Sequence, residues 1–432
     1  MARERTEHTP QVAVDHQGQT GLEAHGPAVV ITRRAADRLR AGHLWVYRSD
    51  VQDLIPREGK DEIAPGAVVA VVDSRSIPLG SGLYSSASQI AVRMVSREAK
   101  LTREGYLAEV AERLRAALAL RDELAPSSRE NDSCRLVFAE ADGLPGIVAD
   151  RYNDLVILQL LTQGTAQPDL RETLVTTLRE HLGGAVSAIV ERPDPKIREL
   201  EELAAPSQEP LYAKPSAKLT TVFTINGTRF HYDAGAGQKT GAFLDQRLNY
   251  AAAAGHARGT ALDVCTYQGG FALHLAKNCE RVTGVDVSLN ALEVADRNLE
   301  LNPSLKAQVD WIEADAFELL REYESTGERF DTIVLDPPAF AKSKRAVEGA
   351  LRGYKEMNLR AMKMLRPGST LVTCSCSHHV GREEFVGVVA AAAADARRRV
   401  QVLETRGAAP DHPEVLTLPE TSYLKCLICR VS

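Results

Sequence analysis

The chain has 432 residues, of which 44% are hydrophobic and 25% charged, as is typical of a protein with two or three folded domains. No run approaches the eighteen apolar residues that a membrane span needs, and the N-terminal segment has no apolar core of a signal peptide. We therefore expect a cytoplasmic protein with reduced cysteines and no membrane contact, and the net charge of −6 argues against an indiscriminate nucleic-acid binder.

The N-terminal part of the chain predicts a leader followed by a small domain of mainly β structure. We expect residues 1–27, which are polar and rich in Gly, His, Gln and Glu, to be a disordered leader. In residues 28–98, apolar runs at Ala67–Val72 and Gln89–Val95 are separated by turn residues, which indicates short strands. One helix is expected early, with Thr32 as its cap.

Positive charge gathers in this first domain. Between residues 29 and 48, five arginines and the single acid Asp37 leave a local charge of +4. Such a surface favours a phosphate-bearing partner, and a merely solvated face is the alternative that deserves equal weight. The residues that we expect to contact nucleic acid here are Arg33, Arg34, Arg38 and Arg40.

The middle segment, residues 99–215, predicts a small α/β domain. Helices are expected over Arg103–Glu123 and Asp169–Leu182, and the segment from Glu191 to Ser216, rich in Pro, Glu and Lys, is expected to be a boundary loop. The expected strands are Arg135–Ala139 and Leu155–Leu161, with turn chemistry at Asp142–Gly146 between strands.

The C-terminal segment, residues 216–432, alternates buried strands with helices, which predicts a mostly parallel sheet covered on both faces. Ligands on such sheets bind outside the carboxyl ends of the strands, at the switch point. The expected strands are Ala261–Cys265, Arg281–Val285, Ala307–Ile312, Thr332–Leu335 and Thr370–Cys374. The expected helices are Gly270–Lys277, Asn290–Leu301, Ala316–Tyr323, Tyr354–Leu365 and Glu383–Ala396.

Polar residues follow successive strands at this edge and predict a nucleoside site. Paired glycines at a strand-to-helix turn let a ligand approach the backbone, and the dinucleotide pattern G-x-G-x-x-G is absent. A carboxylate after the second strand can accept both ribose hydroxyls, and an acid after the third can read an adenine edge. An adenosine site without a phosphate cradle points to S-adenosylmethionine. The residues that we expect to form it are Asp263, Gly269, Gly270, Asp286, Asp315 and Asp336.

Two cysteines end the fifth of these strands, and Cys376 is the expected nucleophile. Cytosine C5 takes a methyl group only after a thiolate has added to C6, so this chemistry needs a cysteine beside the cofactor. The alternative is that Cys374 and Cys376 are small buried residues. A zinc site with His378 and His379 is cramped, so we expect no metal, and Cys426 with Cys429 is expected to lie in a strand rather than to bind one.

The Asp336–Phe340 stretch, Asp-Pro-Pro-Ala-Phe, predicts a pocket for a planar base that carries nitrogen. Asp336 can bind the edge of the base while the ring of Phe340 positions its face. The same motif suits methylation of an amine, so it does not choose the atom. The basic residues Lys342, Lys344 and Arg345 follow directly and are expected to bind phosphate, with Arg352 and Lys355 further along.

With these residues assembled, the chain resembles the bacterial 23S ribosomal RNA cytosine-C5 methyltransferases that carry an N-terminal PUA domain. The resemblance runs from about residue 28 to the C-terminus. Its most specific stretches are Gly237–Arg247, Asp336–Lys344, Arg352–Asn358, Cys374–Ser377 and Ala409–Pro413.

This resemblance implies an α/β protein with a PUA-like RNA-binding domain, a central α/β domain and a Rossmann-like class I methyltransferase domain. It places the nucleophile on Cys376 and adds Tyr267 to the cofactor motifs, with Thr240 and Arg247 where such enzymes close over the methionine end of the cofactor. The implied partner is ribosomal RNA of the large subunit, and a homodimer stays open.

Two other functions stay open. The first is a guanine N-methyltransferase of ribosomal RNA that would use Asp336 and Phe340, because similar motifs occur in relatives that act on guanine. The second is a non-catalytic RNA-binding assembly factor, which needs only the PUA-like domain and the basic loops but leaves the cofactor carboxylates without a function.

Overall fold

The computed structural model describes residues 26–235, 241–341 and 343–432, and it divides into two compact units between Tyr106 and Leu107. The expected leader, apart from Gly26 and Pro27, lies outside the described residues. The expected domain limits after residues 98 and 215 stay predictions.

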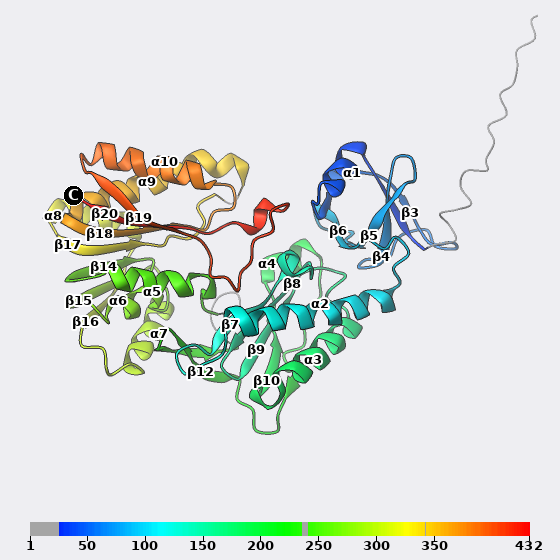
Figure 1. Cartoon of the computed structure of the whole chain (residues 1–432), viewed down its shortest axis with the longest axis horizontal. Helices are drawn as coiled ribbons and strands as arrows, with labels where there is room; N and C mark the ends of the chain where they lie inside the picture. The colour runs from blue at the N-terminus through cyan, green and yellow to red at the C-terminus, as the bar shows by residue number, and fades with distance from the viewer. Residues whose placement is uncertain (1–25, 236–240, 342) are drawn as a thin grey trace, which may run out of the picture. The chain divides into compact units, whose positions relative to one another are not determined.

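A six-stranded sheet forms the smaller unit (Figure 1). Its strand order is β2-β6-β5-β4-β1-β3, and the pairing of β1 with β4 is parallel while the others are antiparallel. The predicted early helix is confirmed, since the Thr32 hydroxyl accepts a hydrogen bond from the Ala35 N–H at 3.3 Å. The elements are β1 (Ala28–Ile31), α1 (Arg33–Arg40), β2 (Trp45–Tyr47), β3 (Val51–Ile55), β4 (Val68–Asp73), β5 (Pro78–Tyr84) and β6 (Ile90–Ser96).

The larger unit begins with a five-stranded sheet in the order β11-β10-β9-β8-β7. One sequence expectation is wrong here, because the supposed loop after Glu191 contains a helix and a strand. The helix forms because the Asp194 side chain accepts the N–H groups of Lys196 and Ile197, and Pro195 suits the first helical position. The elements are α2 (Arg103–Leu124), β7 (Ser133–Phe138), β8 (Ile147–Tyr152), β9 (Leu155–Leu160), α3 (Pro168–Leu182), β10 (Ala188–Glu191), α4 (Pro195–Leu200) and β11 (Tyr212–Ala213).

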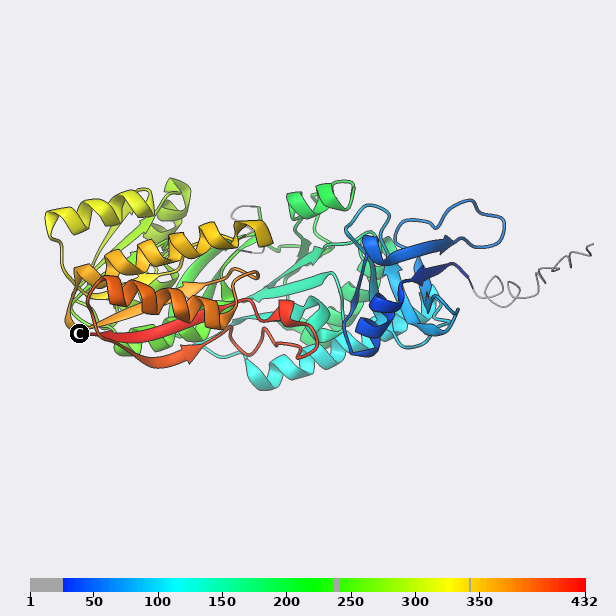
Figure 2. The same ribbon diagram turned by 90° about the horizontal axis from the view of Figure 1, so that it is seen from above.

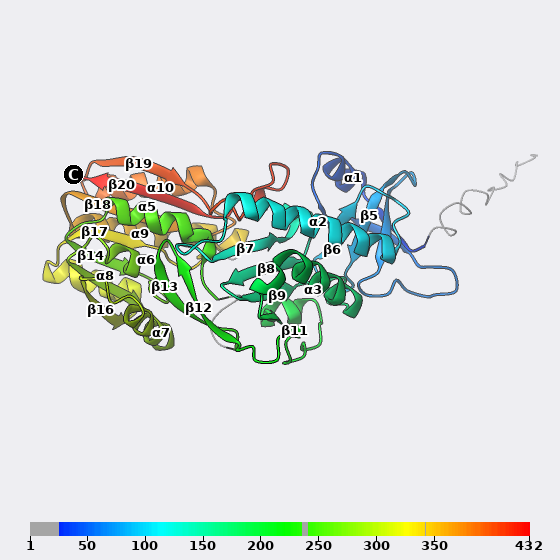
Figure 3. The same cartoon turned by 60° about the horizontal axis from the view of Figure 1, so that its bottom comes forward.

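A hairpin of β12 (Thr220–Ile225) and β13 (Thr228–Asp233) joins this sheet to the rest of the larger unit (Figure 3). On one side the Asp132 carboxylate accepts the N–H of Thr224 at 2.6 Å. On the other side the Asn298 side chain accepts the N–H of His231 at 2.7 Å. Both halves of the larger unit are therefore fastened to the same hairpin.

A seven-stranded sheet in the order β16-β15-β14-β17-β18-β20-β19 forms the rest of the larger unit, and its first five strands are parallel, as expected. Strands β20 and β19 continue it in antiparallel pairing. The strands are β14 (Thr260–Val264), β15 (Arg281–Asp286), β16 (Gln308–Glu313), β17 (Phe330–Leu335), β18 (Leu365–Ser375), β19 (Val400–Arg406) and β20 (Lys425–Val431).

Helices cover both faces of this sheet and enclose two apolar cores (Figure 1). On one face lie α5 (Arg247–His256), α6 (Gly270–Leu275) and α7 (Leu289–Glu300). On the other lie α8 (Ala316–Thr326), α9 (Val347–Met364) and α10 (Arg382–Asp395), and α9 and α10 run side by side (Figure 2). Helix α9 begins before the expected Tyr354, because Gly349 and Gly353 weaken the helical pattern there but not the packing.

Among the described residues, no helix is both long and apolar enough to cross a membrane.

Candidate active site

The carboxyl ends of β14, β17 and β18 meet at one edge of the seven-stranded sheet. Strand β14 lies at the switch point, with β15 on one side and β17 on the other. Crevices at such points are the usual ligand sites of parallel α/β sheets. The residues that the sequence singles out after these strands are therefore brought to one edge.

Asp263 lies beneath the turn that joins β14 to α6. Its side chain is fully buried, and one oxygen accepts the Thr266 hydroxyl at 2.5 Å and the Ala272 N–H at 2.9 Å. Burial raises the pKa of this carboxyl to about 7. These contacts fix the turn on the helix, and a direct contact of Asp263 with a cofactor stays a prediction.

The turn itself holds backbone conformations that side chains rarely adopt. The φ angles are +65° at Cys265 and +52° at Tyr267, and strain of this kind gathers at functional sites. Gly269 has φ +84°, which suits glycine. A Cβ on Gly270 would lie 2.6 Å from the Tyr250 hydroxyl, so this close approach also requires glycine.

Two acids beyond the turn fit the nucleoside part of S-adenosylmethionine. Asp286 accepts the N–H groups of Tyr267 at 2.9 Å and Ser288 at 3.0 Å, which leaves capacity on the carboxylate for ribose hydroxyls. Asp315 is exposed and caps α8 through one oxygen only. Two carboxylates beside this glycine turn accept hydrogen bonds and carry negative charge. They therefore suit the hydroxyls and amine of an uncharged adenosine better than a diphosphate.

The expected residues at the methionine end are placed less directly. Thr240 lies outside the described residues. The Tyr267 hydroxyl donates to the Gly241 carbonyl at 3.2 Å, so the turn after β14 contacts the residue that follows Thr240. Arg247 is buried in an ion pair of 3.2 Å with Asp411, which favours a structural role. Cofactor contact by Arg247 stays a prediction.

Asp336 follows β17 and is held by its neighbours. Its carboxylate accepts the Gln246 amide at 3.0 Å, and its own N–H donates to the Val264 carbonyl at 3.2 Å. Removal from water, together with the charges of Asp245 and Asp263, raises the pKa of Asp336 to about 8. The group is therefore largely protonated at neutral pH and can donate a hydrogen bond.

Cys376 lies one residue beyond the end of β18 and is half-buried, with Sγ 3.8 Å from the Pro337 carbonyl oxygen. The structure thus brings the cysteine against the Asp-Pro-Pro turn. Cys374 instead pairs with Cys426 across the sheet and is fully buried, which raises the pKa of its thiol well above the usual range. Of the two cysteines, only Cys376 is partly exposed at this edge, and its role as the nucleophile stays a prediction.

The expectation for Cys426 and Cys429 is confirmed, since both lie buried within β20. His378 is exposed while Cys374 is interior, so the zinc alternative lacks a common site. In the part of the chain that the structure describes, no group of three or more His, Cys, Asp or Glu residues could hold a metal.

A tyrosine from α9 braces the segment that carries Cys376. The Ser375 hydroxyl donates to the Tyr354 hydroxyl at 3.0 Å, and the Tyr354 and Ser377 hydroxyls lie 2.9 Å apart. The ring of Phe340 packs on Tyr354, with centroids 4.8 Å apart. Phe340, which is expected to position the base, therefore packs on the tyrosine that holds both neighbours of Cys376.

Two residues that the sequence analysis missed are Lys425, the first residue of β20, and Tyr423, just before that strand. Lys425 is 3% exposed, and its ammonium donates to the carbonyls of Ser377 and Tyr423, both at 2.7 Å. The Tyr423 hydroxyl donates to Asp245 at 2.6 Å. The signal in the sequence that could have pointed to this place is the lysine inside the mostly apolar run Tyr423–Val431.

The N-terminal arginines are more neutralised than their local sequence indicates. Asp50 lies 3.1 Å from Arg34 and 2.5 Å from Arg38, and Asp73 lies 2.6 Å from Arg40. These two acids follow the stretch 29–48, so a count over that stretch alone overstates the free charge. The side chain of Arg33 is 90% exposed and pairs only loosely with Asp37, at 3.9 Å.

The basic residues after the Asp-Pro-Pro turn divide in the same way. Lys344 and Arg345 lie in a short exposed 3-10 turn, while Lys342 lies outside the described residues. Arg352 pairs with Glu348 at 2.5 Å and Lys355 with Asp395 at 2.8 Å. Of this group, Lys344 and Arg345 keep the role of expected phosphate contacts best.

The loop after β19 locks the middle of the chain to the active-site edge. Asp411 is fully buried, accepts the N–H of Arg135 at 3.0 Å, and its carbonyl accepts the Arg121 guanidinium at 2.9 Å. The Phe138 ring packs on Tyr423, with centroids 6.1 Å apart. The five-stranded sheet therefore reaches the surroundings of Cys376.

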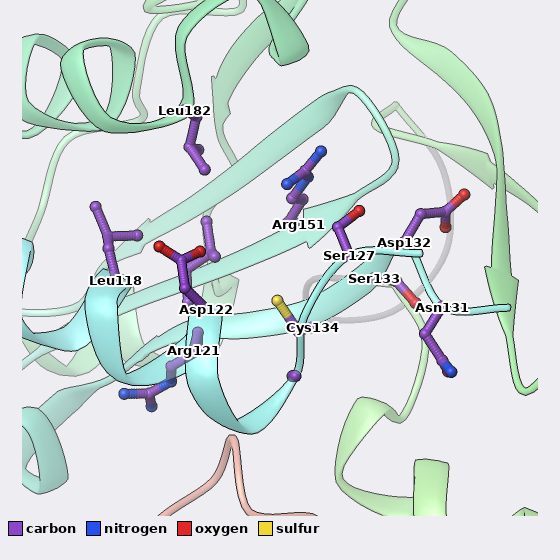
Figure 4. A pocket seen from close by; sticks show the side chains of 12 residues that line it. Leu118, Arg121, Asp122, Ser127, Asn131, Asp132, Ser133, Cys134, Arg151 and Leu182 are labelled. Atoms are coloured by element: carbon purple, nitrogen blue, oxygen red, sulfur yellow. The ribbon is translucent and has the colours of Figure 1, made fainter. Parts of the chain in front are cut away.

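A separate cavity lies between α2 and β7, lined by Arg121, Cys134 and Arg151 among others (Figure 4). Its volume of about 30 Å³ suits water rather than a nucleoside. None of the expected site residues lines it, so it is not part of the candidate active site.

Comparisons with known proteins assign two regions of the chain. Residues 29–97 match the model of a PUA-like domain, and residues 160–430 match that of an S-adenosylmethionine-dependent methyltransferase. The ribosomal RNA large subunit methyltransferase I of Erwinia tasmaniensis is 37% identical over 409 residues, covering 93% of this chain and 99% of that protein. That of Shewanella denitrificans is 40% identical over 399 residues, covering 91% and 96%.

Two solved structures share the fold. They are SMU.776 complexed with SAH, with a TM-score of 0.77, and a SAM-dependent methyltransferase from Streptococcus mutans, with a TM-score of 0.76. Each is 17% identical to this chain and covers 93% of it and 99% of the solved chain. The expected α/β fold, with its β-rich first domain and Rossmann-like last domain, is confirmed.

Proposed function

The chain belongs to the family of S-adenosylmethionine-dependent methyltransferases that includes ribosomal RNA large subunit methyltransferase I, and on that premise we propose that it methylates C5 of a cytidine in 23S ribosomal RNA. The observation that carries the choice of atom is the half-buried thiol of Cys376, 3.8 Å from the carbonyl of Pro337. An amine target would need no thiol at this place.

The cofactor, when bound, supplies an electrophilic methyl group on a sulfonium. Cys376 attacks C6 of the cytosine as a thiolate, so that an S–C6 bond forms. The electrons of the C5=C6 bond would then take the methyl group at C5, while the methyl–sulfonium bond breaks and S-adenosylhomocysteine leaves. When the C5 proton has left to a base such as water, the C5=C6 bond forms again and the C6–S bond breaks. Cys376 is then a thiolate once more.

Asp336 supports the addition step. With a pKa raised to about 8 by removal from water and by Asp245 and Asp263, it carries a proton at neutral pH. A carboxylic acid can donate this proton toward N3 of the ring, which stabilises the negative charge that the thiolate brings. The Gln246 amide holds the carboxyl in place at 3.0 Å.

The remaining site residues have binding roles in this proposal. Tyr267, Gly269, Gly270, Asp286 and Asp315 would hold the cofactor, and Phe340 would position the face of the base. Lys344 and Arg345, which follow the Asp-Pro-Pro turn, would contact phosphates of the RNA. Arg33 of the first domain would contact phosphates as well. A PUA-like domain supports a folded RNA as the substrate.

The test is methyl transfer in vitro followed by nucleoside analysis. The full chain is incubated with methyl-labelled S-adenosylmethionine and either naked 23S ribosomal RNA or large ribosomal subunits, and digested nucleosides are identified by mass spectrometry. We expect label in 5-methylcytidine. Label in a methylguanosine would instead establish the guanine N-methyltransferase alternative, and binding without any transfer would favour the assembly factor.

A further inference from the structure

Lys425 is a buried cation without a carboxylate partner. The residue is 3% exposed, and lysine is almost never fully buried unless it is paired. Its ammonium donates to two neutral acceptors, the carbonyls of Ser377 and Tyr423, both at 2.7 Å. In residues 26–235, 241–341 and 343–432, no aspartate or glutamate lies within ion-pair distance of it. Two carbonyl oxygens therefore accept hydrogen bonds from the ammonium, but no carboxylate neutralises its charge.

The position of this charge is set by the sheet. Lys425 begins β20 and pairs directly with Ser375, the last residue of β18. The Ser377 carbonyl that it binds belongs to the residue after Cys376, so the ammonium lies against the short segment that presents the thiol. Lys425 thus contacts the chain at Ser375 and at Ser377, and Cys376 lies between these two residues.

Among the described residues, neither the two phenols beside this segment nor the start of α10 supplies an equivalent charge. Burial raises the pKa values of Tyr354 and Tyr423, so both phenols stay neutral. Arg382 and Glu384, at the start of α10, act on Lys425 with opposite signs. Burial lowers the pKa of Lys425 to about 8, and the interaction with Cys376 opposes that effect, as expected for an ammonium beside a thiolate.

We propose that Lys425 is a positioning residue that holds a positive charge beside Cys376 and so raises the fraction of this cysteine that is thiolate before the RNA arrives. A cation close to a cysteine lowers its pKa, and the thiolate is the form that attacks. The need for a thiolate rests on the proposed function, whereas the coupling between Lys425 and Cys376 does not. The two residues titrate as a pair, so the apparent pKa values belong to both.

The test measures the reactivity of the Cys376 thiol in the full chain without RNA. The rate of alkylation by iodoacetamide is followed from pH 5 to 10, and the Cys376 peptide is quantified by mass spectrometry. Wild type should give an apparent thiol pKa below the usual value of about 8.5. In Lys425→Met the apparent pKa should rise by about one unit or more, which lowers the rate at pH 7 about tenfold. Lys425→Arg should restore most of the rate.

Two controls keep the result interpretable. Lys363→Met removes an exposed lysine near the end of α9 that pairs with Glu324 of α8, and it should leave the alkylation profile unchanged. If Lys425→Met does not fold, the wild-type profile and Lys425→Arg still decide. A wild-type thiol pKa at or above 8.5, or a folded Lys425→Met with the wild-type profile, overturns the proposal. Failure to find 5-methylcytidine in RNA would remove the proposed function and leave this coupling intact.

Discussion

The Tyr354 hydroxyl lies 2.9 Å from the Ser377 hydroxyl, and the Ser375 hydroxyl donates to the same tyrosine at 3.0 Å. One phenol on α9 thus holds both neighbours of Cys376. Because the peptide segment is held at each side of the cysteine, the direction of the thiol depends on Tyr354 together with Lys425, whose ammonium binds the Ser377 carbonyl.

Tyr354→Phe should lower kcat while it leaves cofactor affinity unchanged. The loss of about 1.4 kcal/mol of hydrogen bonding corresponds to about a tenfold lower rate, because the brace acts on the thiol and not on the adenosine site. Single-turnover methylation and calorimetric titration with S-adenosylhomocysteine measure the two effects. Tyr323→Phe, on α8, is the matched control with wild-type kcat. Equal kcat values in all three proteins would show that the brace has no part in the reaction.

Gly270→Ala should weaken cofactor binding about tenfold or more. A Cβ at this position would meet the Tyr250 hydroxyl at 2.6 Å, so the turn must move away from α5. Overpacking of this kind also costs about 1–3 kcal/mol of stability. Gly255→Ala is the control, since a Cβ there meets nothing within 4 Å and alanine favours a helix. Titration with S-adenosylhomocysteine that gives one affinity for both variants would contradict this account of the turn.

The protonated form of Asp336 predicts an alkaline loss of activity. Removal from water, with Asp245 and Asp263, raises its pKa to about 8, so kcat/KM for the RNA should fall as the pH rises through that value. In the folded protein the proton is held more tightly than in the unfolded chain, so between about pH 4 and 8 the free energy of unfolding falls as the pH rises.

Asp336→Asn tests the stability part of this prediction. The amide has no proton to lose, so the decline of Tm from pH 6 to pH 9 should be smaller in the variant than in wild type, by roughly the several degrees that ~2–3 kcal/mol produces. Differential scanning fluorimetry over this range measures both proteins. Parallel Tm curves, or a wild-type kcat/KM that stays level to pH 9.5, would show that Asp336 is already ionised.

Removal of the Asp411 carboxylate should destabilise the larger unit by about 3–5 kcal/mol, because Arg247 would keep a buried charge without its partner. Burial opposes ionisation of Asp411, but His412 and Arg247 hold its pKa well below the usual value. Its contribution is therefore present above about pH 4 and is lost as the pH falls.

Urea unfolding of Asp411→Asn at pH 7 and pH 3 measures this contribution. The variant should unfold at a lower urea concentration than wild type at pH 7, and the difference should shrink at pH 3. Asp395→Asn, which removes a half-exposed partner of Lys355, is the control with a change below about 1 kcal/mol. A midpoint for Asp411→Asn equal to that control would contradict the importance of the buried network.

Much of the fold follows from local patterns. Strand and helix alternation after residue 260 gives the parallel sheet, and Thr32 gives the start of α1, because these signals depend on near neighbours. Helix α4 and the early start of α9 were missed, since a proline-rich segment and two glycines weaken the pattern while tertiary packing decides.

The site divides along the same line. Strand ends place Asp286, Asp336 and Cys376 at one edge, and this was predictable from chain order alone. Lys425 lies nearly fifty residues from Cys376, and its contact depends on the antiparallel insertion of β20 beside β18. Pairing of Asp50 and Asp73 with the N-terminal arginines also depends on contacts between distant parts of the sequence. Such contacts need the register of a folded sheet.

The most direct test of the account is a covalent trap at Cys376. RNA in which the target cytidine is 5-fluorocytidine cannot lose a C5 proton after methyl transfer, so the S–C6 bond should persist. With S-adenosylmethionine present, we expect a protein–RNA adduct whose crosslinked peptide contains Cys376, formed by wild type and by Cys374→Ala and absent in Cys376→Ala. An enzyme that methylates normal RNA but forms no adduct, or one joined through another cysteine, would contradict the central claim.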